Sequence, residues 1–536
     1  MLDLGRTFLQ SVERAPHATA LVDGALRLTY GDWALRIGAA QRGLRSLGLG
    51  RGDHLLSVLQ NRAEAATLHW ACQFEGIVMT PLNWRAKPDE IDHALSDSGA
   101  KALVFELASE PAVVESAQAI GVTRVSVGKV DSSHLRFEDC MAGSNAPQPL
   151  AHADDLSLML YTSGTTGAPK GVPRRHRTER IAALAHVAQN QYGYGECTLG
   201  VMPLYHTMGV RSLLTLALLD GRFVCMPRFD AAAALKAIAV EKVSHLYFVP
   251  TLYHDLLAHA DFAATDITSV RKLGFAGAPM HDALLQRLQA AFKPDLFVNH
   301  YGSSEIYTVA INQRAVAKPG SAGRAGINTR LRVIALDGAS VEQRAAPGEE
   351  GQIIAELLSD EAFEGYHRRP DANAKSLRDG WYFTGDTGYV DGDGDLFVTG
   401  RVDDMIISGG ENISPVDIES VLSLHPAVDE VAVAGLADPR WGQKVVAFIK
   451  TRSPVAAAAL DAHCRASDLV NFKRPRDYVF VREIPKSPVG KVLRRKLVAG
   501  DYLHADAGDG DGNGDSDSDS AHDDHSSDTP VQEKHP

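Results

Sequence analysis

The segment YTSGTTGAPKG, residues 161–171, is the most informative part of this sequence. It follows the apolar run LSLML at 156–160, which has the composition of a buried strand. Its glycines let backbone amides approach an anion closely, its hydroxyls add hydrogen-bond donors, and Lys170 supplies a mobile positive charge. These residues together predict a phosphate-binding loop. It differs from the G-x-x-x-x-G-K-[ST] loop, because Gly171 follows Lys170 where a magnesium-binding hydroxyl would stand.

Five further segments accompany this loop, which by itself is also compatible with a plain surface connection. In chain order they are FAGAPM at 275–280, YGSSE at 301–305, WYFTGD at 381–386, GRVDDMIISGGENI at 400–413 and PKSPVGKVLRR at 485–495. Together with the loop they form the ordered motif series of the adenylate-forming superfamily. The chain therefore resembles the acyl- and aryl-CoA synthetases over about residues 1–500, and it looks most similar to ligases of the 4-chlorobenzoate and benzoate type.

The domain organisation follows from the residues and from this resemblance. Short β-rich runs such as GQIIAEL and DEVAVAGL alternate with helical patterns such as DALLQRLQAAF, which predicts an α/β protein. The resemblance implies a large N-terminal adenylate-forming domain of several packed α/β subdomains at 1–400, a hinge at 401–404, and a small mobile α+β domain at 405–503. Residues 504–536 are rich in Asp, Ser and Gly and almost free of apolar side chains, so they predict a disordered acidic tail.

The resemblance also assigns roles in adenylation, in which a carboxylate attacks the α-phosphorus of MgATP and expels pyrophosphate. Because both partners are anions, Lys491 is expected to bridge carboxylate and phosphate in the transition state. Glu305 is expected to organise Mg²⁺, which prefers oxygen ligands. Asp386, assisted by Arg401, should hold the ribose hydroxyls. The implied ATP-binding set is Thr162, Ser163, Gly164, Thr165, Thr166, Gly167, Lys170, Ala278, Tyr301, Gly302, Ser304, Asp386 and Arg401, with Ala278 and Tyr301 flanking the adenine.

Each of these roles has an ordinary structural alternative. Lys491 is equally compatible with a surface lysine, Glu305 with an exposed loop acid, and Asp386 with a turn residue beside Gly385. The presence of all the motifs in order favours the catalytic interpretation. The residues taken as catalytic are Lys491, Glu305, His206 and Arg401.

The acid-binding pocket is carried over position by position from the resemblance. His206 in MPLYH is expected beside the acyl carboxylate, although a packed, hydrogen-bonded histidine is the competing view. Tyr307 replaces a methionine of the chlorobenzoate-type ligases, and a rigid ring disfavours a bulky para substituent. Benzoate-like acids and five-membered heteroaromatic acids such as furoate therefore rank above chlorobenzoate, and all of these above long fatty acids. The implied set is His206, Thr207, Met208, Tyr247, Ala276, Gly277, Tyr301, Tyr307 and Thr308.

For the second step the resemblance implies rotation of the C-terminal domain about Asp403, followed by attack of CoA on the acyl-adenylate. Gly409 and Gly410 would then line a channel for the pantetheine arm, since residues without side chains permit close approach. Stacking rings and guanidinium groups suit the CoA nucleotide. The remaining implied CoA-binding residues are Trp441, Phe472, Arg474 and Arg476, with a core tryptophan and a solvated basic turn as the alternatives.

Composition limits the other function classes. The formal net charge of −13 comes mainly from the tail, where nine Asp and one Glu oppose one Lys, so no basic groove for nucleic acid is indicated. No apolar stretch approaches the ~20 residues of a membrane helix, and the start lacks the layout of a signal peptide, so we expect a cytoplasmic protein that does not enter the membrane. The five scattered cysteines predict buried free thiols.

Two aspartate-rich stretches imitate the start of a calcium-binding loop. They are DGDGDLF at 391–397 and DGDGNGDSDSDS at 509–520. Their twelfth positions hold Val402 and Ser520, where such a loop needs a bidentate glutamate. The first stretch therefore predicts a strand-connecting turn, and the second predicts weak, nonspecific cation binding at most.

The function expected from the resemblance is ligation of a small carboxylic acid to CoA, with ATP and CoA as co-substrates, Mg²⁺ bound with ATP, and a homodimer as the assembly the family suggests. The alternatives are a medium-chain fatty acyl-CoA synthetase, a stand-alone adenylation enzyme that loads a carrier protein, a luciferase-like oxidative enzyme, and a non-catalytic nucleotide-binding protein. An amino-acid pocket would place an acidic residue for the ammonium group. The joint presence of Lys170, Glu305 and Lys491 opposes the non-catalytic alternative.

Overall fold

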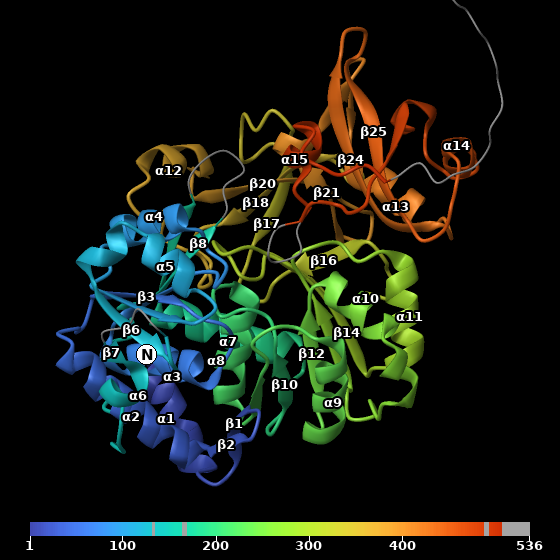
Figure 1. Cartoon of the computed structure of the whole chain (residues 1–536). Helices are drawn as coiled ribbons and strands as arrows, with labels where there is room; N and C mark the ends of the chain where they lie inside the picture. Colours follow the sequence, from blue (N-terminus) through green and yellow to red (C-terminus); the bar gives the residue numbers. More distant parts are fainter. Residues whose placement is uncertain (131–134, 163–168, 487–491, 506–536) are drawn as a thin grey trace, which may run out of the picture.

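The computed structural model describes residues 1–130, 135–162, 169–486 and 492–505, with the backbone alone at positions 403 and 412. Two α/β halves lie side by side and a smaller domain, orange to red, sits above them (Figure 1). The protein therefore has the α/β architecture with a large N-terminal and a small C-terminal domain that the sequence predicted. Several of the predicted residues lie outside the described ranges: Ser163, Gly164, Thr165, Thr166, Gly167, Lys491 and the tail from residue 506.

The first half is built on a seven-stranded sheet whose β3–β8 core pairs in parallel and whose last strand is antiparallel. All five residues of β5 are buried, as expected for a parallel strand covered on both faces. In sheet order the strands are β7 (Leu135–Arg136), β6 (Thr123–Val127), β5 (Ala102–Glu106), β3 (His54–Val58), β4 (Val78–Pro81), β8 (Leu156–Thr162) and β9 (Lys170–Arg175). Its helices are α2 (Tyr30–Ser46), α3 (Ala63–Glu75), α4 (Pro88–Ser98), α5 (Glu110–Glu115) and α6 (Phe137–Cys140).

The second half is built on a longer sheet with a parallel centre. That centre runs β1 (Thr19–Asp23), β11 (Arg222–Cys225), β10 (Cys197–Gly200), β12 (His245–Phe248), β13 (Lys272–Phe275) and β14 (Leu296–Tyr301), with β2 (Leu26–Thr29) at its edge. Antiparallel strands continue it: β15 (Ala310–Asn312), β16 (Ser321–Ala325), β21 (Leu396–Arg401), β20 (Trp381–Val390), β18 (Gly351–Glu356) and β17 (Leu331–Ile334), with β19 (Leu377–Arg378) beside β20. The helices are α1 (Leu4–Arg14), α7 (His176–Gln189), α8 (Thr207–Leu218), α9 (Ala231–Glu241), α10 (Pro250–Ala258), α11 (Asp282–Phe292) and α12 (Pro370–Ser376).

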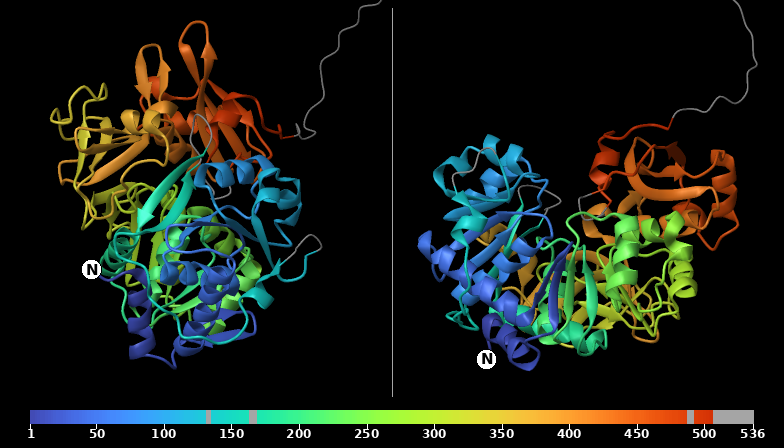
Figure 2. Two further views of the ribbon diagram at one scale, coloured as in Figure 1. Left: turned by 90° about the vertical axis from the view of Figure 1, so that its left-hand side faces the viewer. Right: turned by 60° about the horizontal axis from the view of Figure 1, so that its bottom comes forward.

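The C-terminal domain is α+β, and its described residues form a five-stranded sheet, three short α-helices and the single turn η4 (Asn471–Lys473). The single turn η3 (Val402–Asp404), which contains the predicted hinge position, joins it to β21. Its elements are β22 (Ile406–Ser408), β23 (Glu411–Ile413), β24 (Val428–Asp438), β25 (Gly442–Thr451), β26 (Asp477–Phe480), α13 (Pro415–Ser423), α14 (Ala457–Arg465) and α15 (Arg494–Val498). The views in Figure 2 place this domain against the half that contains α10, where Asp429 lies 3.8 Å from His254.

Two local details complete the description of the fold, and the second differs from the prediction. Ser414 occupies the N-cap position of α13 and Pro415 its first turn, and the Ser414 hydroxyl donates to the Thr399 carbonyl. All five cysteines are free, and Cys140 is only partly buried, in contrast to the predicted burial of all five. Among the helices in the described part of the chain, none is both long and apolar enough to cross a membrane.

Candidate active site

The parallel centre of the long sheet gathers the motif residues at one edge. Tyr247 lies near the end of β12, Ala276 follows β13 and Tyr301 ends β14, and these three strands are parallel neighbours. The carboxyl ends of parallel strands meet at one edge of a sheet, which is where α/β proteins bind ligands. The motifs that are far apart in the sequence are thereby placed on a common surface.

The nucleotide side of this surface contains a connected polar group. The Tyr301 hydroxyl donates to Asp386 Oδ2 at 2.6 Å, and Arg401 Nε lies 3.3 Å from Asp386 Oδ1. Asp386 and Arg401 are cross-strand partners on β20 and β21. Burial disfavours the charged form of Arg401, but the Asp386 carboxylate favours it, and the pKa of Arg401 is raised overall. The structure therefore brings three of the predicted ATP-binding residues together around one carboxylate.

Glu305 lies in a tight loop after β14. A Cβ on Gly302 would come within 2.2 Å of the Tyr307 carbonyl oxygen, so the loop needs glycine there. Glu305 itself is buried, and the Tyr366 hydroxyl donates to its Oε1 at 2.7 Å. Lys170 Nζ lies 4.2 Å from the centre of the Tyr366 ring, and burial lowers the pKa of Lys170 while Glu305 opposes that shift. Tyr366 thus connects the end of the glycine-rich loop to the predicted metal-organising carboxylate.

The predicted acid-binding residues line the start of α8 and the ends of the central strands. His206 is the N-cap of α8, and its Nδ1 accepts from the Met208 amide at 3.3 Å. Burial, with a smaller contribution from Arg211, lowers the pKa of His206 to about 4, so the ring is neutral at pH 7. The Tyr307 ring lies 3.9 Å from the Arg174 guanidinium carbon, and its hydroxyl donates to Glu179 at 3.1 Å. The Tyr307 ring is therefore held by Arg174, and its hydroxyl is already hydrogen-bonded to Glu179.

Two residues join this constellation without having been singled out from the sequence. Arg211 donates to Thr308 and Tyr247, and Tyr366 donates to Glu305. A signal for Arg211 exists, because it is the single charged residue of the apolar helix TMGVRSLLTLAL and lies four residues after Thr207, on the same helix face. Tyr366 lies in the loop between β18 and α12, where the sequence has no periodic pattern that would single it out. Its proximity to Glu305 therefore comes from the tertiary fold alone.

The predicted CoA-binding residues form a partly exposed group on the C-terminal domain. The Gly409 amide donates to the Trp441 carbonyl at 2.9 Å, and a Cβ on Gly409 would come within 2.9 Å of the Trp441 ring. The Arg476 guanidinium lies 5.8 Å from the centre of the Trp441 ring, and Gly410 follows with φ of 87°. Phe472 is exposed on a separate turn, and Arg474 Nη1 donates to Asp461 at 2.9 Å. The structure brings Gly409, Trp441 and Arg476 together but commits Arg474 to an intradomain ion pair.

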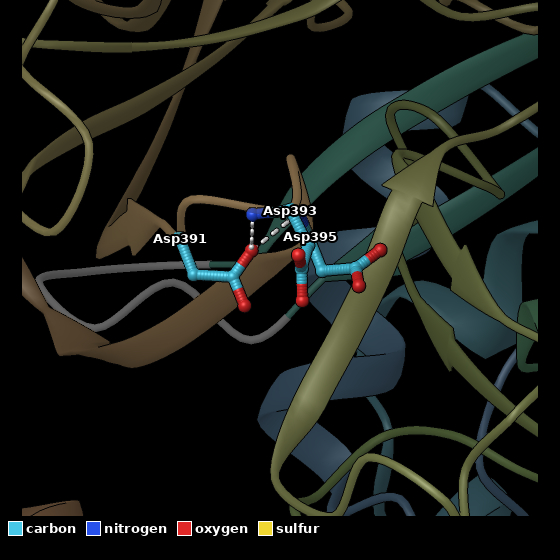
Figure 3. Close-up of side chains that lie close together, drawn as sticks. All are labelled: Asp391, Asp393 and Asp395. Carbon is cyan, nitrogen blue, oxygen red and sulfur yellow. Dashed lines mark hydrogen bonds between the residues drawn. The ribbon is translucent and has the colours of Figure 1, made fainter.

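The aspartate-rich turn between β20 and β21 places three carboxylates together, with ligand oxygens within 4.8 Å of one another (Figure 3). A positively charged side chain of the protein already lies among these three carboxylates. Lys318 Nζ lies 2.6 Å from Asp391, 3.0 Å from Asp393 and 2.6 Å from Asp395. The turn therefore connects two strands, as the sequence predicted, and its three carboxylates share an ion pair with Lys318, while Arg324 also pairs with Asp395 at 3.2 Å.

Replacing Lys318 with methionine is expected to lower the unfolding temperature at neutral pH, because three carboxylates then repel one another. Lys318 holds the pKa of Asp391 below its ordinary value of 3.8, and Lys318 and Arg324 together lower the pKa of Asp395 against the opposing effect of burial. A carboxylate with a lowered pKa contributes stability above its ordinary pKa and loses it as the pH falls through the lowered value. The difference in unfolding temperature between wild type and K318M should therefore shrink as the pH falls below 3.8. The matched change of the exposed Lys236 to methionine should show no such pH dependence, and a pH-independent K318M deficit would contradict the assignment.

Comparison with known proteins identifies the family. Residues 8–367 match the AMP-binding enzyme family, and residues 417–491 match the AMP-binding enzyme C-terminal domain. The chain belongs to the AMP-binding enzyme family. Among AMP-binding enzymes, it is 34% identical over 509 residues to 4-chlorobenzoate–CoA ligase of Arthrobacter sp, covering 93% of this chain and 95% of that protein.

Other AMP-binding enzymes show similar extents of likeness. Long-chain-fatty-acid–CoA ligase FadD13 of Mycobacterium tuberculosis is 31% identical over 506 residues, covering 93% of this chain and 98% of its own length. The crystal structure of the anthranilate CoA ligase AuaEII in complex with anthranoyl-AMP matches with a TM-score of 0.85 at 26% identity, covering 93% of this chain and 97% of that chain. The protein is therefore an AMP-forming acid–CoA ligase that uses a carboxylic acid, ATP and CoA.

Proposed function

We propose that this enzyme activates a small aryl or heteroaryl carboxylic acid, benzoate- or furoate-like, and transfers the acyl group to CoA with release of AMP and pyrophosphate. The observation that carries the proposal is a buried, hydrogen-bonded group among the residues that are predicted to line the acid pocket. Tyr247, Tyr307 and Thr308 are all buried there and are connected through Arg211. A long alkyl chain would have to displace this hydrogen-bonded group, which a short ring would not.

In the proposed mechanism the described residues position the reactants for adenylation. Asp386 and Arg401 hold the ribose, and the neutral His206 lies beside the acyl carboxylate without adding charge. Glu305, fixed by Tyr366, would hold Mg²⁺ with ATP, since a buried carboxylate beside a phosphate-binding loop suits a hard cation. Bound there, the ion would neutralise the phosphate charge that develops as pyrophosphate leaves. Lys491, outside the described residues, completes this arrangement by its expected bridge between carboxylate and phosphate.

Two other substrate classes remain competitors, and relatives support one of them. FadD13 is a long-chain fatty acid ligase by its name, so a medium-chain fatty acid is the runner-up for this chain. A carrier-protein thiol in place of CoA is the second. We further infer a cytoplasmic homodimer from the substrates and the family, with light scattering as the measurement of the assembly state.

The test is pyrophosphate release from MgATP with benzoate, 4-chlorobenzoate, 2-furoate, a medium-chain fatty acid and an amino acid, each with and without CoA. Strong CoA-dependent turnover with one small aryl acid and weak turnover with the fatty acid is the expected result. Preference for the fatty acid would overturn the aryl assignment. Pyrophosphate release that CoA does not accelerate would favour a carrier protein as the acceptor.

Substituting proline for Asp403 is expected to leave adenylate formation within a few-fold of wild type and to lower CoA thioester formation by about a hundredfold. Proline fixes φ near −65° and so restricts rotation at the proposed pivot in η3. Single-turnover measurement of the two half-reactions separates the effects. Substituting alanine at the same position is the matched control, since it keeps the backbone free, and full turnover by the proline variant would show that the pivot lies elsewhere.

A further inference from the structure

Arg211 lies buried among the residues that are predicted to line the acid pocket. Arg211 belongs to α8, whose other eleven residues carry no charge, and its exposed fraction is 2%. Among the described residues, no carboxylate oxygen lies within 4.0 Å of its guanidinium nitrogens, and the nearby buried Glu179 pairs with Arg174 instead. A buried guanidinium without a close anion is uncommon, since taking the charge out of water is costly unless it is paired.

The hydrogen bonds of Arg211 leave one edge of the guanidinium unused. Nη1 donates to Thr308 Oγ1 at 2.9 Å and to the Tyr307 carbonyl at 3.3 Å, and Nη2 donates to the Tyr247 hydroxyl. Nε is fully buried and has no partner in the described part of the chain. All three partners are residues expected to line the acid pocket, so the guanidinium lies among those residues and not in a remote part of the core.

A buried carboxylate interacts electrostatically with Arg211, but no described residue accepts a hydrogen bond from its Nε–H. Glu361 is fully buried, and its Oε2 has no partner among the described residues, while its Oε1 accepts from Asn328. Burial raises the pKa of Glu361, and the charge of Arg211 opposes that rise. The other buried carboxylate nearby, Glu179, is paired with Arg174 at 2.7 Å. Glu361 therefore interacts with the charge of Arg211, and neither carboxylate accepts a hydrogen bond from Arg211 Nε.

The histidines at this end of the pocket do not accept from it either. Burial, with the charge of Arg211 among the further causes, lowers the pKa of His186 and of His300 well below 6.5, so both rings are neutral. Both rings pack on Tyr247, with centroid separations of 4.8 and 5.0 Å. These rings therefore pack on the same tyrosine whose hydroxyl accepts a hydrogen bond from Arg211.

We propose that Arg211 is a specificity residue whose Nε–H donates to an oxygen acceptor on the acyl part of the substrate, so that the preferred acid carries a hydroxyl, carbonyl or second carboxylate oxygen beyond its reacting carboxylate. This inference rests on the proposed function of the same pocket. A purely hydrocarbon acid would leave the buried donor unpaired, whereas an oxygen substituent satisfies it. The expected discrimination between two such acids of equal size is about 10- to 100-fold in kcat/KM.

The test compares hydroxybenzoates with the methylbenzoates of the same ring position, because a methyl and a hydroxyl group are nearly equal in size. The wild-type enzyme is expected to prefer the hydroxyl acid at one ring position, and Arg211→Met is expected to reduce that preference to about unity. The loss should appear as a raised KM for the hydroxyl acid, with the methyl acid little changed. Arg180→Met, which removes a partly buried guanidinium on α7, is the matched control and should retain the preference.

Further experiments test whether the acceptor on the substrate is charged or neutral, and a second variant is available if Arg211→Met does not fold. Benzenedicarboxylates test an anionic acceptor, and Glu361→Gln should improve them relative to the neutral hydroxyl acids, because it removes the opposing charge. If Arg211→Met does not fold, Arg211→Lys keeps the charge and loses the Nε–H, and must still reduce the preference. Equal kcat/KM for both acids at every position in wild type, or an unchanged preference in a folded Arg211 variant, would overturn the inference. Absence of CoA-dependent turnover with every aryl acid would instead overturn the proposed function.

Discussion

Replacing Lys491 with alanine is expected to slow adenylate formation by about a thousandfold while leaving thioester formation from a supplied acyl-adenylate within a few-fold of wild type. Adenylation brings a carboxylate to a triphosphate, so a positive charge between them matters most in that transition state. Thiolysis has already lost the pyrophosphate and needs no such bridge. Single-turnover pyrophosphate release and CoA thioester formation from synthetic acyl-adenylate measure the two steps separately.

A second lysine provides the control for this prediction. Lys496 lies on α15 close in sequence to Lys491, but its ammonium is partly exposed and pairs with Asp501 at 2.8 Å. Lys496→Ala should leave both half-reactions unchanged. Equal losses of adenylation and thiolysis in Lys491→Ala would show that this lysine supports the structure of the domain and not the first reaction.

Replacing Glu305 with glutamine is expected to lower the adenylation rate by about a hundredfold and to raise the Mg²⁺ concentration needed for half-maximal activity. The substitution keeps the shape of the side chain and removes one unit of negative charge at the proposed cation site. Because an amide oxygen can still accept from Tyr366, the loop should keep its position. Initial rates measured across a Mg²⁺ series at fixed ATP test the prediction.

The Tyr366→Phe variant tests the positioning of the Glu305 carboxylate separately from its presence. It removes the hydroxyl that donates to Glu305 at 2.7 Å and keeps the ring below Lys170. We expect about a tenfold loss, since one charge-assisted hydrogen bond is removed while the carboxylate remains. A Glu305→Gln enzyme with an unaltered Mg²⁺ requirement would contradict the proposed metal role, whatever the size of the rate loss.

The sequence was most informative at short motifs whose composition is compatible with a single structural or chemical role. Asp386 and Arg401 were expected at the ribose and Tyr301 beside the adenine, from motifs that span a hundred residues. The structure brings the three together, with the Tyr301 hydroxyl and the Arg401 guanidinium both on Asp386. The turn at 391–395 was expected to connect strands, and it does, since β20 and β21 flank it. The ion pairs of this turn with Lys318 could not be predicted, because 73 residues separate that lysine from Asp391 and no pattern links them.

The amino-acid sequence alone determined the family, the α/β class and the order of the motifs, because a phosphate loop, strand-end carboxylates and glycine turns leave local signatures. Only the tertiary structure decided which side chains from separate elements share one buried space. Arg211 meets Tyr247 and Thr308 because α8 packs against the ends of β12 and the loop after β14, and Tyr366 meets Glu305 in the same way. Such contacts depend on how elements pack over long sequence separations, which local composition does not encode.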